Sequence, residues 1–263
     1  MPASYAHLCY GQMVYRKFPA GLREQIRRHP QAFLVGLHGP DLFFFYRPYQ
    51  INNKIAAIGH QAHGVPALPF FQKGRNLLRR EYDAETENYL LGFLCHFALD
   101  SSCHPYISAY EKEREVRHSD IETELDRALM ERRGKDPLRT DPVAHLRPNF
   151  RLAEKIASLF PETAPVTVYR CMKDFQRYSR LLICRGKKKE RLLRQILELG
   201  GKKNFIAGMV MGRRRYEGCG ESTEVLLRKM KEAVPLGTEL VEQFHRCCRD
   251  GAPLDERLDR DYK

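Results

Sequence analysis

The chain has no tryptophan, no long apolar run and no regular cysteine spacing. A membrane-spanning helix needs ~20 apolar residues, and no run approaches that length, which excludes a transmembrane segment. The N-terminal residues lack a basic stretch followed by an apolar one, so they do not form a secretory signal. The eight cysteines form no disulfide framework. We therefore expect reduced thiols and a cytoplasmic protein.

Residues 87–106, ENYLLGFLCHFALDSSCHPY, place His96, Asp100 and His104 four residues apart in an apolar stretch. On a helix, this spacing puts the three side chains on one face, which here points into a core. A buried imidazole–carboxylate hydrogen bond would account for two such residues, since buried polar groups find partners. A third ligand-type residue at the same spacing makes a metal site the better interpretation.

More residues of these types occur in the first half of the chain, where eight of the ten histidines precede residue 130. His118 and Glu122 are again four apart on a helical stretch, where an exposed face is the alternative. The further candidates are His7, Asp41, His60 and His63. Nitrogen and carboxylate ligands without thiolates suit zinc, with manganese or iron as alternatives. Because the ligands exceed one tetrahedral site, the sequence predicts a cluster of two or three metals.

These motifs resemble the zinc-dependent phospholipase C family, whose fold is shared with the zinc-dependent single-strand nucleases. The resemblance covers roughly residues 2–130 and rests on motif order: His7, GPD at 39–41, a histidine at 60–63, HFALDSSCH and HSDIE. It implies a first zinc held by Asp41, His63, His96 and Asp100. It implies a second zinc held by His104, His118 and Glu122, and a third held by His7 with Asp100 as the bridge.

In that family the third zinc also takes the free amine of a processed N-terminal tryptophan, which this sequence lacks. Removal of the initiator Met would expose Pro2, whose amine is the expected substitute. For the first site, His60 competes with His63. We prefer His63, because the family's histidine tends to precede a loop and an aromatic pair, here residues 70–71.

Apolar residues recur three and four positions apart, which predicts an all-α protein, a multi-helix bundle with the metal site in its core. We expect a metal-binding helical core over residues 1–135 and a basic helical part over 151–263, packed on the same domain. Segment 136–150, with three prolines, is the expected connection. Further helices are predicted at 151–160, 165–184, 187–199 and 221–248, followed by a polar tail that is frayed or lies on the surface.

Positive charge is concentrated in the second half of the chain. Residues 1–130 carry 15 basic and 14 acidic side chains, a net of +1, whereas residues 131–263 carry 30 and 19, a net of +11. The densest clusters lie at 185–191 and 213–215. Such a surface favours peripheral association with an anionic surface or other phosphate-rich partner, although a solvated helical face is an equal alternative.

The resemblance implies a phosphoester hydrolase, a phospholipase C-like phosphodiesterase that uses a zinc-activated water on a substrate such as a phospholipid headgroup. Asp41 is the candidate catalytic residue, because at the edge of the metals it could orient that water or take its proton. His38 is interpreted as a supporting or structural residue. Aromatic candidates for the rim, each more expected in the core, are Tyr5, Phe43, Phe44, Tyr46 and Phe70. The alternatives are a nuclease or nucleotidase with the same cluster, or a non-catalytic metal-binding regulatory module.

Overall fold

The computed structural model describes residues 3–50, 52–198 and 205–262. Within these ranges it contains thirteen α-helices and two 3₁₀ helices, and its only β pairing is an isolated bridge between Ile183 and Met211. The predicted all-α fold is confirmed. No helix in the described ranges is long and apolar enough to cross a membrane. All eight cysteines are buried and free.

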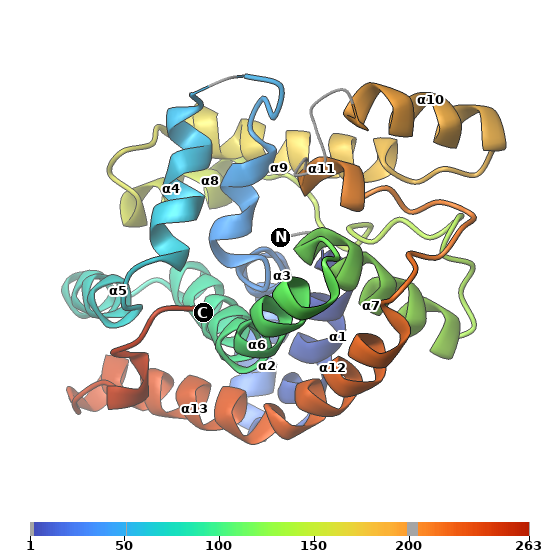
Figure 1. The fold of residues 1–263 in the computed structure, drawn as a ribbon. Helices are drawn as coiled ribbons and strands as arrows, with labels where there is room; N and C mark the ends of the chain where they lie inside the picture. Colours follow the sequence, from blue (N-terminus) through green and yellow to red (C-terminus); the bar gives the residue numbers. More distant parts are fainter. Residues whose placement is uncertain (1–2, 51, 199–204, 263) are drawn as a thin grey trace.

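The 31-residue helix α6 (Ala84–Arg114) runs through the middle of the molecule (Figure 1). Its N-cap is Asp83, whose carboxylate accepts a hydrogen bond of 2.8 Å from the backbone N–H of Thr86. It ends at Glu115, which adopts the left-handed conformation with φ 54°. Between these ends the helix is buried on nearly every side from residue 86 to 101, as expected of a helix that other helices surround.

The other helices of the first half pack around α6 and carry the remaining candidate ligands. They are α1 (Ser4–Tyr15), α2 (Ala20–Arg28), α3 (Pro30–Gly36), the 3₁₀ helix η1 (Gly39–Phe45), α4 (Lys54–His63), α5 (Leu68–Arg80) and α7 (His118–Arg132). Helices α1, α3 and α7 contact α6 directly, while α4 packs on η1, which itself touches α6. Every candidate ligand therefore lies on α6 or on an element that surrounds it.

Two glycines let α3 cross α6 at very short range. A Cβ atom at Gly36 would lie 2.1 Å from the backbone oxygen of Tyr89, and one at Gly92 would lie 2.2 Å from that of Phe33. No side chain fits at either position, because backbone atoms cannot move aside without shifting a helix. This close crossing sets η1, which follows α3, directly against the middle of α6.

The second half of the chain closes the bundle. It comprises α8 (Phe150–Leu159), α9 (Pro165–Leu181), α10 (Lys187–Glu198), α11 (Phe205–Gly208), α12 (Gly220–Glu232), α13 (Val234–Asp250) and the 3₁₀ helix η2 (Glu256–Leu258). Helices α12 and α13 both pack on α6, and α13 also contacts α1 and α5 (Figure 1). The two halves therefore share buried surface along α6.

Two of the predicted helices differ from the structure. The helix predicted at 221–248 is two helices that meet at Ala233, because Pro235 in the first turn of α13 has no N–H to continue the ladder. The helix predicted at 165–184 ends at Leu181. The helix predicted at 187–199 is present from Lys187 to Glu198, and residue 199 lies outside the described residues. Asp41 lies on the 3₁₀ helix η1.

The prediction of a frayed or surface-lying tail is wrong for its last residues. Leu258 is 2% exposed and Tyr262 is 1% exposed, so both lie within the core. Their burial removes two apolar side chains from water, which offsets the entropy lost in ordering the polar residues between them.

Candidate metal centre

Helix α6 presents His96, Asp100 and His104 on successive turns of one buried face. The Asp100 carboxylate lies between the two imidazoles: its Oδ2 is 3.1 Å from His96 Nε2, and its Oδ1 is 3.7 Å from His104 Nε2. The sequence spacing alone predicts this arrangement, since positions four apart stack on a helix.

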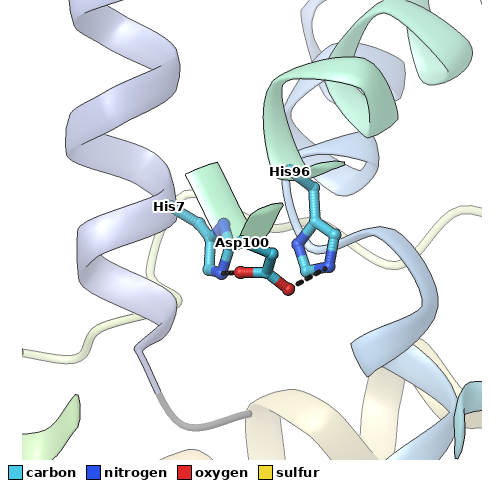
Figure 2. A group of neighbouring side chains, drawn as sticks. All are labelled: His7, His96 and Asp100. Carbon is cyan, nitrogen blue, oxygen red and sulfur yellow. Dashed lines mark ion pairs between the residues drawn. The ribbon is translucent and has the colours of Figure 1, made fainter. Parts of the chain in front are cut away.

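Helix α1 places His7 beside the Asp100 carboxylate as well, next to the oxygen that does not contact His96. His7 Nε2 lies 3.3 Å from Asp100 Oδ1, and the His7 ring stacks on the His96 ring with centroids 4.4 Å apart. Figure 2 shows Asp100 between these two imidazoles, with one carboxylate oxygen directed to each. A single carboxylate thus faces histidines from two helices, which is the geometry that a bridging ligand requires.

Asp126 on α7 fixes the start of α1 and with it the position of His7. The Asp126 carboxylate accepts hydrogen bonds from the backbone N–H groups of Tyr5 at 3.1 Å and Ala6 at 2.7 Å. These N–H groups belong to the first turn of α1, where no partner exists within the helix. Asp126 therefore acts as a capping group supplied from another helix.

We expect Asp126→Ala to destabilise the protein by about 2–4 kcal/mol, because it leaves two buried N–H groups without an acceptor. Asp126→Asn, which keeps one acceptor oxygen, should lose about half as much. Urea unfolding of the metal-free proteins measures both changes. Equal stability of the alanine variant and the wild type would show that solvent replaces the carboxylate at this helix end.

Asp41 and His63 come from η1 and α4. Gly39, with φ +44°, begins the turn, and a Cβ atom there would lie 2.6 Å from the His96 ring, so the GPD motif requires its glycine. Asp41 Oδ1 lies 3.2 Å from His63 Nε2. His63 Nδ1–H donates to the Gly59 carbonyl at 2.7 Å, which leaves Nε2 as the nitrogen that faces Asp41 and Asp100.

A second group forms where α6 faces α7. His118 Nε2 lies 3.2 Å from Glu122 Oε1, and His104 Nε2 lies 3.8 Å from the same oxygen. His104 Nδ1–H donates to the backbone carbonyl of Tyr262 at 3.0 Å, so the other ring nitrogen faces the carboxylates. Glu122 is 1% exposed, whereas the His118 side chain is 20% exposed. This group therefore lies nearest to solvent.

The hydrogen-bond inventory supports a fit to metal ions. Within the described residues, these eight side chains each carry a buried nitrogen or oxygen without a hydrogen-bond partner: His7, Asp41, His63, His96, Asp100, His104, His118 and Glu122. Two ligands on a tetrahedral zinc, each about 2.1 Å from it, would lie about 3.4 Å apart. The nitrogen–oxygen separations here, 3.1 to 3.8 Å, match that value. Buried polar groups left without partners are costly, and bound cations would satisfy those that face the ligand groups. An exception is His7, whose unpaired atom is Nδ1 and not the Nε2 that faces Asp100.

The ligand atoms fall into three groups, in each of which all atoms lie within 4.8 Å of one another. The groups are His7, His96 and Asp100; Asp41, His63 and His96; and His104, His118 and Glu122. The third group has the same members as the predicted second zinc site. His96 belongs to both other groups, so its assignment to one zinc stays a prediction.

Electrostatics keep the carboxylates ionised in the absence of a cation. Burial alone would raise the pKa of Asp100, but the imidazoles of His104, His96 and His7 hold it well below its usual value. Burial likewise opposes ionisation of Glu122, whose pKa is lowered by His118 and His104. Burial lowers the pKa of His63, yet Asp100 and Asp41 raise it to about 10. A proton on His63 therefore occupies the place that a metal cation would take.

The other histidines near the site lie outside these three groups. His60 is exposed and its ring packs on Phe44 with centroids 4.5 Å apart, whereas His63 faces Asp41. His38 is buried, and its Nε2 lies 2.8 Å from His145 Nε2 and its ring 6.4 Å from that of His7. Sequence reasoning missed His145, because it lies in the connecting segment 136–150. The predicted amine ligand, Pro2, lies outside the described residues.

A cavity of about 540 Å³ opens beside the metal centre, with His63, His104 and His118 in its wall. A second cavity of about 310 Å³ has an apolar lining and shares Phe44, Pro48 and Ile206 with the first. Of the five aromatic rim candidates, Phe44 lines both cavities and the other four do not. Tyr5 and Phe43 are buried in the core, and Phe70 and Tyr46 pack against it.

A helical bundle whose core holds clustered histidines and carboxylates beside an open cavity is an arrangement typical of metal-dependent hydrolases. The model of the zinc-dependent phospholipase C family matches residues 6–167, which is more than half of the 263-residue chain. The chain belongs to this family. The match extends beyond the region 2–130 on which the resemblance rests. No curated protein and no solved structure matches the chain.

Proposed function

We propose that the protein is a metal-dependent hydrolase that cleaves a phosphoester bond in a phospholipid, using two to three zinc ions. The observation that carries the proposal is a set of eight candidate ligand side chains, each of which carries a buried polar atom without a hydrogen-bond partner among the described residues. Three of them, His63, His104 and His118, line a cavity. Membership of the zinc-dependent phospholipase C family supports the choice of metal and of bond.

Zinc ions at these groups would supply a water molecule of lowered pKa and positive charge for the phosphoryl oxygens. We propose that Asp41 orients this water or accepts its proton, because η1 places the Asp41 carboxylate beside the imidazole of His63. Burial opposes ionisation of Asp41, but His96 and His63 hold its pKa below the usual value, so its carboxylate stays ionised.

The cavities favour a lipid over a nucleic acid. Among the described residues that line them, none is Lys, Arg, Asp or Glu. A nucleic-acid groove needs basic side chains along its length to offset the phosphates. An apolar cavity that adjoins the metal centre instead suits the aliphatic part of a lipid whose headgroup phosphate lies at the metals.

Helix α10 supports peripheral association with an anionic lipid surface. Residues 187–189 are three exposed lysines, and the same helix exposes Leu192 and Ile196. Basic and apolar side chains on one interfacial helix are typical of reversible binding to anionic membranes. We also propose a cytoplasmic location, which the eight buried free cysteines support, because free thiols persist in a reducing compartment.

We expect protein purified without chelator to contain two to three zinc equivalents and to hydrolyse phosphatidylcholine. Extensive dialysis against a strong chelator should abolish turnover, and added zinc should restore it. Elemental analysis and release of phosphocholine measure these results. An aryl phosphodiester serves as a substrate without an aliphatic chain, and single-stranded DNA tests the nuclease alternative.

Each alternative gives a different result in this comparison. Zinc-dependent cleavage of DNA but not of phosphatidylcholine would show that the protein is a nuclease and not a phospholipase. Bound zinc without turnover of any of the three substrates would favour a non-catalytic metal-binding module. Less than one zinc equivalent per chain after zinc is resupplied would overturn the metal centre itself.

A further inference from the structure

The C-terminal segment 251–262 returns from α13 across the molecule to the metal centre. It leaves α13 at Gly251, forms η2 and continues past α5 toward α6 (Figure 1). The backbone carbonyl of Arg260 accepts a hydrogen bond of 3.1 Å from the N–H of Ala67, and the Arg260 guanidinium donates to Ser101 Oγ at 3.0 Å. The segment is thus held on both the α5 and the α6 sides.

The segment ends at the metal ligands with a buried tyrosine. The Tyr262 ring lies 5.1 Å from the ring of His63, 5.0 Å from that of Phe97 and 6.0 Å from that of His96, measured between centroids. Its backbone carbonyl accepts the hydrogen bond from His104 Nδ1–H at 3.0 Å. One residue therefore touches a histidine of the first predicted zinc site through its ring and one of the second through its backbone.

The carbonyl contact determines which nitrogen of His104 can bind a cation. Because a carbonyl only accepts hydrogen bonds, Nδ1 must carry a proton, and Nε2 is then the only ring nitrogen whose lone pair can bind a cation. His104 Nε2 is the atom that faces Glu122 and Asp100. The carbonyl of Gly59 accepts the corresponding hydrogen bond from His63 Nδ1–H, and Gly59 lies in the same helix as His63. The acceptor for His104 is instead a residue 158 positions away in the sequence.

From these contacts we propose that Tyr262 is a positioning residue of the metal centre. Its ring anchors the end of the segment among aromatic side chains, and the anchored carbonyl holds His104 in the orientation that binds metal. Segment 251–262 lies outside residues 6–167, which the family model matches, so the family match does not account for this contact. The inference rests on the proposed metal centre but not on which ester is cleaved.

The test compares Tyr262→Phe with Tyr262→Ala in the full-length protein. The phenylalanine variant keeps the anchoring ring and should bind zinc as the wild type does. The alanine variant loses the anchor and should bind one zinc equivalent about 10- to 100-fold more weakly, the usual effect of losing a group that orients a metal-bound histidine. Competition with a chromophoric chelator measures the affinities, and the visible spectrum of the cobalt-substituted protein reports the histidine coordination.

Leu22→Ala is the matched control for a general loss of stability, because Leu22 is buried in α2 away from the metal ligands. It should lower the unfolding temperature of the metal-free protein without changing zinc affinity or the cobalt spectrum. Wild-type affinity and spectrum in Tyr262→Ala, or shifts no larger than those of Leu22→Ala, would overturn the inference. A wild-type protein that binds no zinc would overturn the proposed metal centre first, and the inference with it.

Discussion

Asp100→Asn should release metal from two positions and lower phosphodiester hydrolysis on the order of 10³-fold. The Asp100 carboxylate faces His7, His63, His96 and His104 at 3.1 to 3.7 Å, more of the candidate ligands than any other side chain contacts. An asparagine of the same shape has no negative charge and only one acceptor oxygen. It cannot bridge two cations, so two metal positions should weaken together.

The matched comparison is His60→Ala, which removes an exposed imidazole at the cavity that lies outside the three ligand groups. It should retain the full zinc content and most of the turnover. Elemental analysis and initial rates on the same phosphodiester separate the two variants. Equal losses of zinc from both would mean that His60 completes the first site in place of His63, or that His60 has another role in the metal centre.

The ligand positions that lie on one helix could be predicted from the sequence, because helical geometry converts spacing directly into a shared face. The spacing of His96, Asp100 and His104 is such a case, and so is that of His118 and Glu122. The order of these motifs also led to the zinc-dependent phospholipase C family, which the family match bears out. The choice of His63 over His60 came from the resemblance, and the structure places His63 beside Asp41.

The contacts that could not be predicted join residues far apart in the sequence. Tyr262 reaches His104 across 158 positions, and His145 reaches His38 across 107. Neither contact leaves a periodic signal, because each depends on how whole helices are placed. The apolar residues Leu254, Leu258 and Tyr262 recur four positions apart in an otherwise polar tail, and this spacing was a sign that one side of the tail packs against the core.

The close crossing of α3 and α6 also left no sequence signal, although it positions Asp41. Gly92→Ala should therefore destabilise the protein by at least about 3 kcal/mol, because the new methyl group meets a backbone oxygen rather than a movable side chain. In a protein of this size that corresponds to an unfolding temperature lower by about 6–12 °C. Gly21→Ala is the matched control, since a Cβ atom at Gly21 has nothing within 4 Å and should leave stability unchanged or slightly higher.

The same substitution should affect the two parts of the metal centre unequally. If the protein relieves the clash by moving α3 away from α6, η1 moves with α3 and separates Asp41 from His96. His104, His118 and Glu122 lie on α6 and α7 and do not depend on that crossing. Zinc titration of Gly92→Ala below its unfolding temperature should show one weakened site and one that keeps its wild-type affinity. Uniform weakening of both sites would mean instead that α6 itself is distorted, and that the helix crossing supports the whole centre rather than the Asp41 side alone.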